Sequence, residues 1–524
     1  MATAGLTSLP NELLDEIIKE VLPEDFDSLT LTCKSIYEAC TPFLEQHKHL
    51  CSQFRRFGYM GRPTSPFIRT GFDLLTRIAA EPIVAHYIRD ADFVYDSFPS
   101  REKPIQYLPN IDQGGPVVAL FAESPYLKQA GLDWREYYRL IQDELSDDEP
   151  YYSQYLAAFI LTLLPNAKIL SLPKYWRNLE RTDKLVDVII QNARKPGSLS
   201  ERPSLAKVTG FEPYYSSGPG HKVGLRRAIP FLALPHVRTL AAPSSVALGD
   251  FFQLVASEGQ YLHFGENLVN VQLEGCWIDE VTIGDFLKHT PRLRTLLYSH
   301  VTKPGHEVPQ TWDICKFITA IEREVGGHLE ELFVSVRDLS ARISPGKTSM
   351  RGFQRLKKLE FPVEVAVCNI TDAIPDFSKS ADNITDQELE KHGLLIGDFV
   401  PSSVSELSLL VKGTEDHKNA LKLIFSNFAA KKESQLPDLK EICLWDAFLR
   451  NTTDWLSGPR EEEAKAAHEE ACAKITPEIE QAGVAFRFEK CSWGQSCLEE
   501  WPYSTPKNVR HLMGYKGYVR EREQ

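Results

Sequence analysis

A short apolar motif, L-x-x-L-x-L with Val, Ile, Ala or an aromatic residue as substitutes, recurs along most of the chain. It occurs at Ala167–Leu172, Val237–Ala242, Leu268–Leu273, Leu293–Tyr298, Leu329–Val334, Leu356–Phe361, Val404–Leu409 and Leu439–Leu444. The alternating apolar residues that close each motif predict a short strand. A repeated unit of this size buries its apolar face only against its neighbours, so the units must stack.

Amphipathic stretches precede several of the motifs. We expect helices at Tyr155–Leu164, Ile283–His289, Trp312–Val325 and Ala420–Ala430. Helix followed by strand, repeated, predicts a mixed α/β fold with a parallel sheet. From about residue 151 to 490 the chain resembles leucine-rich-repeat proteins. The resemblance implies an irregular α/β solenoid, with strands on a concave face and helices on the convex back.

The motifs are unevenly spaced. Their starts are 25 residues apart at the closest, from 268 to 293, and 70 residues apart at the widest, from 167 to 237. We therefore expect the segments 174–231 and 365–398 to loop out of the array, which is where repeat proteins often bind. The array is predicted to be irregular, with room for a break into two blocks.

Three short helices are predicted before the repeats, at 9–22, 25–31 and 35–44. Apolar residues at 9, 13, 14, 17, 18, 21 and 22 follow the helical period, and Pro10 suits the first helical position because its missing amide costs no hydrogen bond. Pro23 ends this first helix. So small a unit cannot bury much core alone, so its remaining apolar face is expected to dock on a partner.

Residues 1–46 contain a stretch that resembles the F-box, particularly as it is written in filamentous-fungal proteins. The matching positions are Leu9, Pro10, Glu12, Leu13, Leu14, Ile17, Leu22, Pro23, Asp25, Phe26, Leu29, Leu31, Thr32, Cys33, Lys34, Pro42, Phe43 and Leu44. The resemblance implies docking on a Skp-type adaptor and, through it, a cullin. The residues that inherit this contact or complete the groove are Leu9, Pro10, Leu13, Leu14, Ile17, Leu22, Leu29, Leu31, Cys33 and Tyr37.

Two positions depart from the F-box pattern. Phe26 stands where the family usually has leucine, and Ile36-Tyr37 replaces the tryptophan-containing pattern of many animal members. Losing a tryptophan removes a large anchor, so we expect weaker adaptor binding. The alternative interpretation is an amphipathic helix that closes the N-terminus of the larger domain. The ordered agreement of a dozen positions favours the F-box.

Two further segments flank the repeats. Residues 47–150 are predicted to form a helical neck with loops, including helices at 72–80 and 134–145 around a proline-rich stretch at 99–116. An acidic helix at 460–480 and a strand at 484–488 follow the last motif. Residues 491–524 form an aromatic tail that we expect to cap the open end of the array.

Charge and composition exclude several classes of function. Lys and Arg number 59 against 72 Asp and Glu, so the net charge is 59 − 72 = −13. This charge opposes binding to nucleic acid or anionic membranes. The N-terminus lacks the pattern of a signal peptide, and no apolar run is long enough to span a bilayer, which predicts a cytoplasmic or nuclear protein. Ten dilute cysteines without a CxxC pair predict reduced thiols.

No sequence motif predicts catalysis or a cofactor. Gly346-Lys347-Thr348 copies the end of a phosphate-binding loop, but Ala341 stands where that loop needs glycine. Cys40, His47, His49 and Cys51 cluster in sequence with a spacing that fits no familiar zinc class, so surface histidines on a helix are the simpler interpretation. We therefore expect a binding protein, not an enzyme.

The repeat geometry predicts a target-binding surface. If the leucine positions face the core, the residues between them face the concave side, because strand side chains alternate. The predicted target-binding residues are Asn270, Gln272, Leu297, Glu331, Phe333, Glu360, Glu406, Glu441 and Trp445. We hypothesise that the glutamates select a Lys- or Arg-bearing segment and that Leu297, Phe333 and Trp445 act as apolar anchors. The alternative is a row of ordinary solvated strand positions.

Together these features predict a substrate-recognition subunit of a Skp-cullin-F-box type ubiquitin ligase. Its F-box would hold the adaptor and its repeats a protein target. Two other readings stay open. The first is an F-box or repeat scaffold with a non-ligase interaction role, and the second is an enzyme with a site on the solenoid loops.

Overall fold

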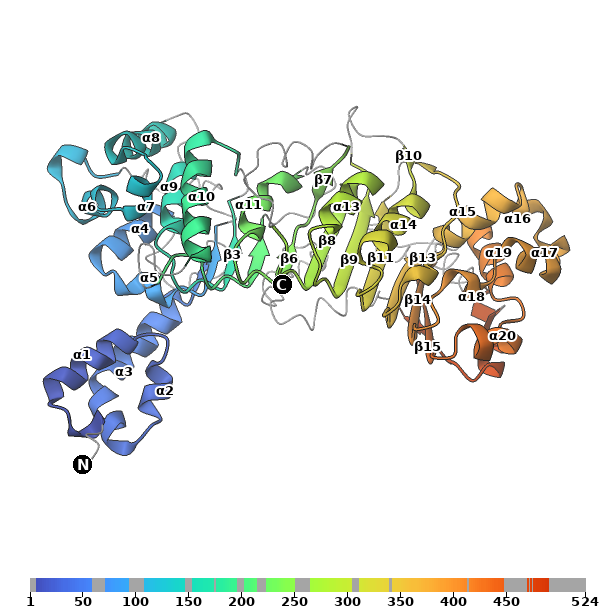
Figure 1. The fold of residues 1–524 in the computed structure, drawn as a ribbon, viewed down its shortest axis with the longest axis horizontal. Coiled ribbons are helices and arrows are strands. Elements are labelled where there is room, and N and C mark those ends of the chain that lie inside the picture. The colour runs from blue at the N-terminus through green and yellow to red at the C-terminus, as the bar shows by residue number, and fades with distance from the viewer. Residues whose placement is uncertain are drawn as a thin grey trace, which may run out of the picture. The chain divides into compact units, whose positions relative to one another are not determined.

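The computed structural model describes residues 6–58, 71–93, 108–146, 153–173, 176–195, 202–213, 223–249, 264–303, 311–338, 342–411, 414–446, 469–470, 472–473 and 475–489. The chain divides into two compact units. The first unit comprises Met1–Tyr214 and Leu234–His236, and the second comprises Tyr215–Ala233 and Val237–Gln524. Both units combine helices with parallel strands, as the predicted α/β class requires (Figure 1).

The first unit begins with three helices and continues as alternating strands and helices. Its elements are η1 Leu6–Ser8, α1 Asn11–Val21, α2 Phe26–Thr30, α3 Lys34–Phe54, β1 Arg56–Gly58, α4 Gly71–Ala80, α5 Ile83–Tyr87, β2 Asp90–Asp92, η2 Ile111–Gln113, α6 Pro116–Ala122, α7 Pro125–Gln129, α8 Trp134–Ser146, α9 Gln154–Leu161, β3 Ile169–Ser171, α10 Glu180–Arg194 and β4 Gly210–Glu212.

Residues 6–46, which we call the N-terminal module, form the three predicted helices. The carbonyl of Pro10 accepts hydrogen bonds from the amides of Leu13 and Leu14, both at 3.1 Å, so α1 begins directly after this proline. Leu22 is extended, as a residue before proline prefers, and α1 ends there. The third helix is longer than predicted, because α3 runs through Pro42 and ends only at Phe54, next to β1.

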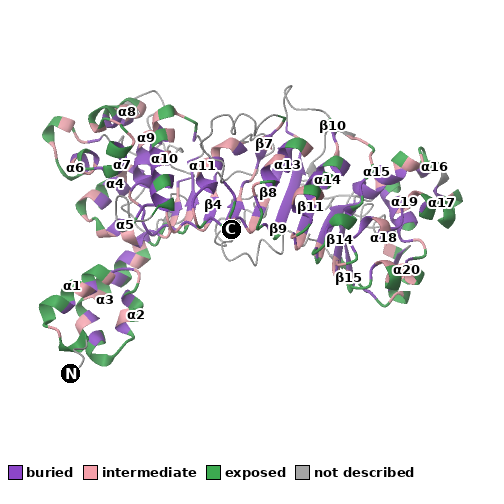
Figure 2. Ribbon diagram, viewed as in Figure 1, coloured by how far each residue is buried: buried purple, intermediate pink, exposed green. Residues whose placement is uncertain are grey.

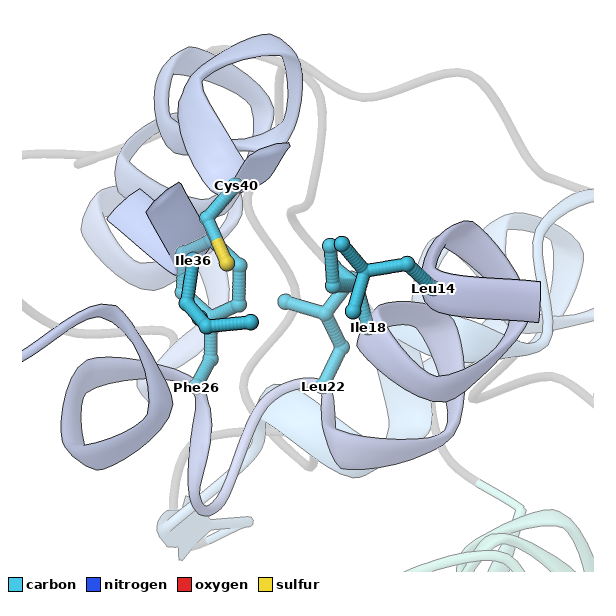
Figure 3. Close-up of a cluster of buried hydrophobic side chains, with 6 residues drawn as sticks. All are labelled: Leu14, Ile18, Leu22, Phe26, Ile36 and Cys40. Carbon is cyan, nitrogen blue, oxygen red and sulfur yellow. The ribbon is translucent and has the colours of Figure 1, made fainter. Parts of the chain in front are cut away.

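The three helices of the module share one apolar core (Figure 3). Leu14, Ile18 and Leu22 project from the α1 side and meet buried side chains from α2 and α3. The buried side chains from α2 and α3 are Phe26, Ile36 and Cys40. Ile83 of α5, which lies outside the module, also packs against this cluster. The module is therefore continuous in packing with the rest of the first unit.

The sheet of the first unit has the order β1-β2-β3-β4, and all three pairings are parallel. Three of these strands were not predicted. The expected neck at 47–150 contains its predicted helices but also β1 and β2, and the segment 174–231, which we expected to loop out, contains α10 and β4. The segments 54–59 and 88–93 around β1 and β2 fit the motif only through its aromatic, Ile and Ala substitutes, and the segment 208–213 around β4 ends in proline.

The second unit continues the alternation of strands and helices. Its elements are β5 Val223–Gly224, η3 Leu225–Arg227, α11 Ile229–Leu232, β6 Thr239–Ala241, β7 Ser245–Ala247, β8 Asn270–Ile278, α13 Glu280–Leu287, β9 Thr295–Val301, β10 Thr311–Trp312, α14 Ile314–Val325, β11 Glu331–Asp338, β12 Arg342–Ile343, η4 Met350–Gly352, β13 Lys358–Pro362, α15 Glu364–Ala373, α16 Phe377–Ser380, η5 Ala381–Asn383, α17 Asp386–His392, α18 Ile396–Phe399, β14 Glu406–Val411, α19 Glu415–Ile424, α20 Phe428–Gln435, β15 Glu441–Asp446 and β16 Ala485–Glu489.

The main sheet of this unit has the order β6-β8-β9-β11-β13-β14-β15-β16, again with parallel pairings. Figure 1 shows β8, β9 and β11 side by side, with α13 and α14 lying along them. Two short pairs, β5 with β7 and β10 with β12, lie off this order, and β7 also pairs with β8. All eight predicted motifs contain a strand of one of the two units, so this part of the prediction is confirmed.

One main-chain carbonyl links each strand to the next. The carbonyl of Arg294 accepts the amides of Glu330 and Glu331, both at 2.9 Å, and the carbonyl of Glu330 accepts those of Lys357 and Lys358. The same paired contact occurs in the first unit, where the carbonyl of Arg89 accepts from Lys168 and Ile169. Repeats of different length therefore enter the sheet in one geometry.

The leucine positions of the motifs face the core, as predicted. In the Leu329 motif, Leu329, Leu332 and Val334 are all fully buried, and the corresponding residues of the other seven motifs are buried as well. Figure 2 shows the strands of the second unit as buried, while the outer surfaces of its helices are exposed. Apolar burial against neighbouring repeats thus holds the array together.

Helices occupy segments that we predicted otherwise. Residues 365–398 do not form an open loop, because α15, α16, α17 and part of α18 lie there. The helix expected at Ala420–Ala430 is two helices, α19 and α20, separated at Asn427, whose φ of 55° is left-handed. Of the predicted helix at 460–480, the described residues 469–470, 472–473 and 475–480 are helical, and the final strand is β16. The tail at 491–524 and residues 99–107 of the proline-rich stretch at 99–116 lie outside the described residues.

None of the helices in the described ranges has the length and apolar character required to cross a bilayer.

The module core generates a stability prediction. Ile18 is fully buried in it, and truncating a buried isoleucine to alanine costs about 2–5 kcal/mol. Ile18→Ala should therefore speed amide hydrogen exchange in α1, α2 and the start of α3, as measured by mass spectrometry. The matched control is Ile283→Ala, which truncates an equally buried residue of α13. It should speed exchange around α13 and leave the module unchanged; equal effects of both variants on the module would contradict the assigned core.

Candidate protein-docking site

Helix α1 carries two adjacent apolar stripes. Leu14 and Ile18 form the inner stripe, which is buried in the module core. Leu13 and Ile17 each precede an inner residue by one position and therefore lie about 100° further round the helix. Leu13 is 48% exposed, and Ile17 is half-buried. The helix thus has more apolar surface than its own module covers.

The exposed apolar side chains of the described chain concentrate in this module. Four of the large hydrophobic residues that are exposed in the described chain, Leu6, Leu13, Leu31 and Tyr37, belong to the module. The other two are Val281 and Phe488 of the second unit. Leu31 is 84% exposed and Tyr37 is 50% exposed. We define the docking face as the exposed residues Pro10, Leu13, Leu31, Cys33 and Tyr37 together with the half-buried Leu9 and Ile17. Single exposed apolar residues are ordinary, but a cluster of them marks an interaction site.

Local chain geometry holds the part of the docking face beyond α1. The Thr32 hydroxyl donates to the carbonyl of Leu29 at 2.7 Å, which closes the turn after α2 and leaves Leu31 in solvent. Cys33 has an extended backbone and directly precedes α3. Its thiol is exposed. Tyr37 lies in the first turn of α3.

Two residues assigned to the adaptor contact lie elsewhere. Leu14 and Leu22 are buried in the module core, because they belong to the inner stripe of α1 and its extension. Leu29 is half-buried and packs against the same core. The expectation that Leu14 and Leu22 present their side chains to a partner is therefore wrong for the chain as described.

The departures from the F-box pattern have separate structural roles. Phe26 is fully buried, and its ring lies 4.7 Å from the ring of His47. His47 also forms a 3.0 Å hydrogen bond with the hydroxyl of Tyr87. Burial lowers the pKa of His47, against an opposing effect of Asp27, so the ring is held neutral in this setting. Phe26 therefore serves packing, whereas Tyr37 remains on the docking face.

The sequence cluster of possible metal ligands does not assemble into a site. Cys40 belongs to the module core, His49 is exposed, and only His47 and Cys51 approach each other, at 3.6 Å. Within the described ranges, no group of three or more His, Cys, Asp or Glu side chains is arranged to hold a metal. The expected continuation of the third helix is present as α3, but of the two histidines expected on its surface only His49 is exposed, whereas His47 is buried.

The phosphate-loop look-alike is a structural connection. The amide of Thr348 donates to Oδ1 of Asn369 at 2.9 Å, and its hydroxyl lies 3.0 Å from that of Thr319. The Gly346 carbonyl accepts from the thiol of Cys315 at 3.3 Å. These contacts tie the segment to α14 and α15, so its backbone is not arranged around a phosphate.

Eight of the nine predicted target-binding residues lie on two rungs of the second sheet, and Trp445 lies further along β15, in register with Leu410. Asn270, Thr295, Glu331, Lys358, Glu406 and Glu441 are in register and half-buried. The next rung in the same direction contains Gln272, Leu297, Phe333, Glu360, Ser408 and Cys443, and only Gln272 of these is not buried.

The expected apolar anchors are not exposed. Leu297, Phe333 and Trp445 are buried, and Glu360 is buried beside Phe333. Side chains of one rung stand only about 4.8 Å apart, so bulky neighbours cover one another. Trp445 packs against Leu410. The expectation that these four side chains face solvent is therefore wrong, whereas target binding by Asn270, Gln272, Glu331, Glu406 and Glu441 stays a prediction.

The glutamates of the half-buried rung, Glu331, Glu406 and Glu441, have partners within the chain. Glu406 forms an ion pair with Lys358 at 3.4 Å, and Glu441 accepts hydrogen bonds from the guanidinium of Arg487. Glu331 accepts from the Thr295 hydroxyl at 3.1 Å. A Lys- or Arg-bearing target would have to displace these partners, which lowers the gain expected from such a contact.

The sheet of the first unit places two carboxylates on either side of a serine. Asp92, Ser171 and Glu212 are in register on β2, β3 and β4, and the Ser171 hydroxyl donates to Glu212 at 3.3 Å. Burial, with the negative charge of Asp92 as a second cause, raises the pKa of Glu212 to about 7. The same effect of burial raises the pKa of Asp90. This site titrates near neutrality but lacks the arrangement of a metal site.

No protein-family model and no curated protein matches the chain. The functional assignment consequently rests on the module and sheets themselves.

Glu212 generates a prediction about pH. The folded chain keeps the Glu212 proton up to about pH 7, whereas the unfolded chain releases it near the ordinary value of 4.5. The folded state therefore binds more protons in this window, and the free energy of unfolding contributed by Glu212 falls as pH rises through it. Glu212→Gln should remove that fall.

The measurement is the denaturant midpoint of the first unit at about pH 5 and about pH 8, for the variant and the parent chain. The variant should gain stability relative to the parent at the higher pH. Glu16→Gln on α1, which changes an exposed carboxylate, serves as the control. An identical pH dependence in all three proteins would contradict the assigned titration.

Proposed function

We propose that this chain is the substrate-recognition subunit of a Skp-cullin-F-box type ubiquitin ligase. In this proposal the N-terminal module is an F-box that binds a Skp-type adaptor, and the strands of the two units belong to a leucine-rich-repeat-like region that binds a protein target. The chain itself supplies no catalytic group. It holds the target near a conjugating enzyme, so that proximity increases the rate of transfer.

The exposed docking face is the observation that carries the proposal. Leu13, Leu31 and Tyr37 lie in solvent in the described chain, and all three occupy positions that the F-box resemblance assigns to the adaptor. Fully burying one such side chain contributes about 1.5–3 kcal/mol. A partner that covers all of them gains enough to offset part of the cost of association, so an apolar groove is the expected binding surface.

The target-binding half of the proposal is supported by the repeated strands. Half-buried polar side chains in register along one rung present hydrogen-bonding groups at regular intervals, and the residues proposed to contact a target are Asn270, Gln272, Glu331, Glu406 and Glu441. Because the neighbouring apolar residues are buried, this contact is expected to be mainly polar. An adaptor-binding protein without ligase activity is the alternative that the experiments separate.

The first test changes the centre of the docking face. Leu13→Asp replaces an apolar contact with a carboxylate that must be desolvated without a partner. Adaptor binding should weaken by about 3 kcal/mol or more, which is roughly a hundredfold in Kd. The measurement is copurification with a Skp-type adaptor, followed by calorimetric titration of the purified pair.

A matched variant controls for the change in charge. Val281→Asp introduces the same carboxylate at a site of similar exposure, 52%, on α13 of the second unit. It should bind the adaptor as the parent chain does. Hydrogen exchange shows whether Leu13→Asp leaves the module folded. Undiminished adaptor binding by a folded Leu13→Asp chain would sink the docking assignment.

The second test uses the exposed thiol of Cys33. N-ethylmaleimide should label Cys33 in the free chain, and a bound adaptor should protect it, because Cys33 lies on the docking face. Cys51, which is half-buried on α3 beyond the module, provides an internal reference whose labelling rate should not change. Equal labelling of Cys33 with and without adaptor would contradict the proposed surface.

Reconstitution separates the ligase from the alternative. The proposal expects the adaptor complex to recruit a cullin and to support ubiquitin transfer. Adaptor binding without cullin recruitment would favour the non-ligase role.

A further inference from the structure

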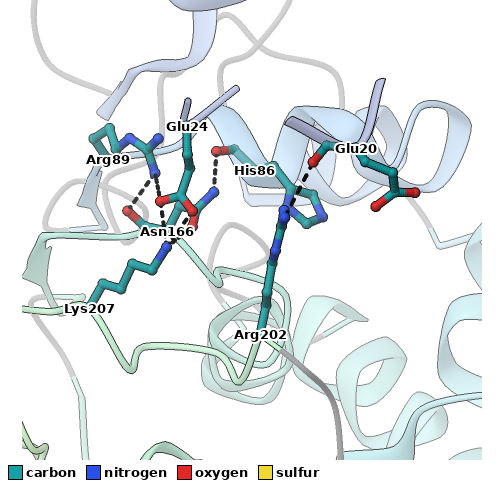
Figure 4. Close-up of polar contacts among 7 residues, drawn as sticks. All are labelled: Glu20, Glu24, His86, Arg89, Asn166, Arg202 and Lys207. Atoms are coloured by element: carbon teal, nitrogen blue, oxygen red, sulfur yellow. Dashed lines mark hydrogen bonds and ion pairs between the residues drawn. The ribbon is translucent and has the colours of Figure 1, made fainter. Parts of the chain in front are cut away.

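Glu24, in the turn between α1 and α2, joins the N-terminal module to the strands of the first unit (Figure 4). Its carboxylate accepts hydrogen bonds from Nζ of Lys207 through both oxygens, and it forms an ion pair with Arg89 at 3.5 Å. Asn166 completes the group. Its side-chain oxygen accepts from Lys207 at 3.0 Å, and its main-chain carbonyl accepts from Arg89 at 3.2 Å.

The residues around Glu24 come from the segments that lead into three successive strands of one sheet. Arg89 directly precedes β2, while Asn166 and Lys207 each stand three residues before β3 and β4. They therefore lie at the same edge of the sheet, where the strands begin. The amide of Asn166 also donates to the carbonyl of His86 at 2.9 Å. One carboxylate of the module thus contacts two of the strand approaches directly and a third through Asn166.

The contact is shielded enough to matter energetically. The side chains of Glu24 and Arg89 are 24% and 18% exposed, that of Lys207 is 41% exposed, and Asn166 is fully buried. Burial alone would raise the pKa of Glu24, but the hydrogen bond from Lys207 and the charges of Lys207, Arg89 and Arg202 hold it below its usual value. Glu24 is therefore ionised at neutral pH. Removing its charge leaves Lys207 and Arg89 uncompensated, which costs more than the loss of an exposed pair.

A second connection leaves the module at a different point. Helix α3 runs without a break from Lys34 to Phe54 and leads into β1. His47 of this helix contacts Tyr87 of α5. A helix by itself permits bending and rotation about its base. Ile83 of α5 also packs against the module core, and Arg202 donates to the main-chain carbonyl of Glu20. The contact at Glu24 adds a charged group that holds the α1–α2 turn to the strand approaches.

We propose that Glu24 is a positioning residue, which fixes the orientation of the N-terminal module on the strands of the first unit through Lys207, Arg89 and Asn166. This inference rests on the proposed function for its consequence, because an adaptor bound to the docking face would be held in the same orientation. The site of ubiquitin transfer is then restricted to lysines that this geometry brings within reach.

The orientation is measured in the full chain without any partner. Spin labels are attached at Glu16→Cys on α1 and Arg139→Cys on α8, both exposed positions of the first unit, after the other accessible cysteines are replaced by serine. Pulsed electron–electron double resonance should give a single narrow distribution of the distance between the two labels in the parent chain. Glu24→Gln should lose the narrow distance and give a broad distribution.

Two variants show that the effect belongs to the charge contact. Glu20→Gln is the matched control, because Glu20 contributes only its main-chain carbonyl, which accepts from Arg202 at 3.3 Å. It should keep the narrow distance. Lys207→Gln, which removes the charge that donates to both oxygens of Glu24, should broaden the distribution as Glu24→Gln does. A distribution for Glu24→Gln as narrow as that for Glu20→Gln overturns the inference.

A second readout tests the consequence for transfer. In an assembly reconstituted with adaptor, cullin and conjugating enzyme, the parent chain should be ubiquitylated on a restricted set of its own lysines. Glu24→Gln should keep its affinity for the adaptor but spread the modification over more lysines, as mapped by mass spectrometry. An unchanged lysine pattern overturns the consequence. Failure of the parent chain to bind the adaptor rejects the proposed function, while the distance measurement still decides the role of Glu24.

Discussion

The paired acceptance of two amides by one carbonyl is the interaction on which both sheets depend. At most steps the carbonyl before one strand, such as that of Arg294, receives two successive amides of the next repeat, and at the step to β16 the carbonyl of Lys440 receives the amide of Ala485. Because the contact involves only the main chain, it sets no limit on the length of chain between strands. Segments as different as 293–329 and 356–404 therefore enter the sheet in the same way. Side chains then decide only which face is buried.

This backbone constraint separates the two kinds of surface in the molecule. The apolar side chains of the sheets are buried between neighbouring repeats. The polar side chains along the half-buried rung of the second unit pair with one another, as Lys358 does with Glu406. The N-terminal module has no sheet to join. Its three helices cover one apolar stripe of α1 and leave the neighbouring stripe in solvent. An apolar partner is therefore expected at the module, and a polar one along the strands.

The sequence predicted the parts of this arrangement that depend on local pattern. The period of apolar residues located α1, and the leucine motifs located eight strands with their buried positions. It missed β1 and β2, although Phe54-x-x-Phe57-x-Tyr59 and Ile88-x-x-Ala91-x-Phe93 satisfy the motif through its permitted substitutes. It missed β4 because Pro213 stands at the last position of the motif there. In these repeats the main chain, which any residue supplies, carries the pairing. A leucine pattern is thus sufficient for a strand but not required for one.

The exposure of candidate binding residues was less predictable. Alternation along a strand correctly separated Leu332 from Phe333, but it did not indicate that Phe333 would be covered by its lateral neighbours. Those neighbours come from other repeats, so their size is not readable from one motif. Glu24 was missed for a related reason, since its partner Lys207 is 183 residues away in sequence. Only the order of strands brings these residues together.

Helix α3 runs without a break from the module to β1, so its length determines the direction in which the module faces. Each residue of an α-helix advances the chain by 1.5 Å and turns it by about 100°. Adding or deleting one residue between His47 and Phe54 would thus rotate the entire docking face about the helix axis and carry Glu24 away from Lys207. Insertions close to whole turns, about seven residues at a time, would alter the reach of the module while nearly preserving its facing. The length of this helix can therefore change without turning the docking face only in steps close to whole helical turns.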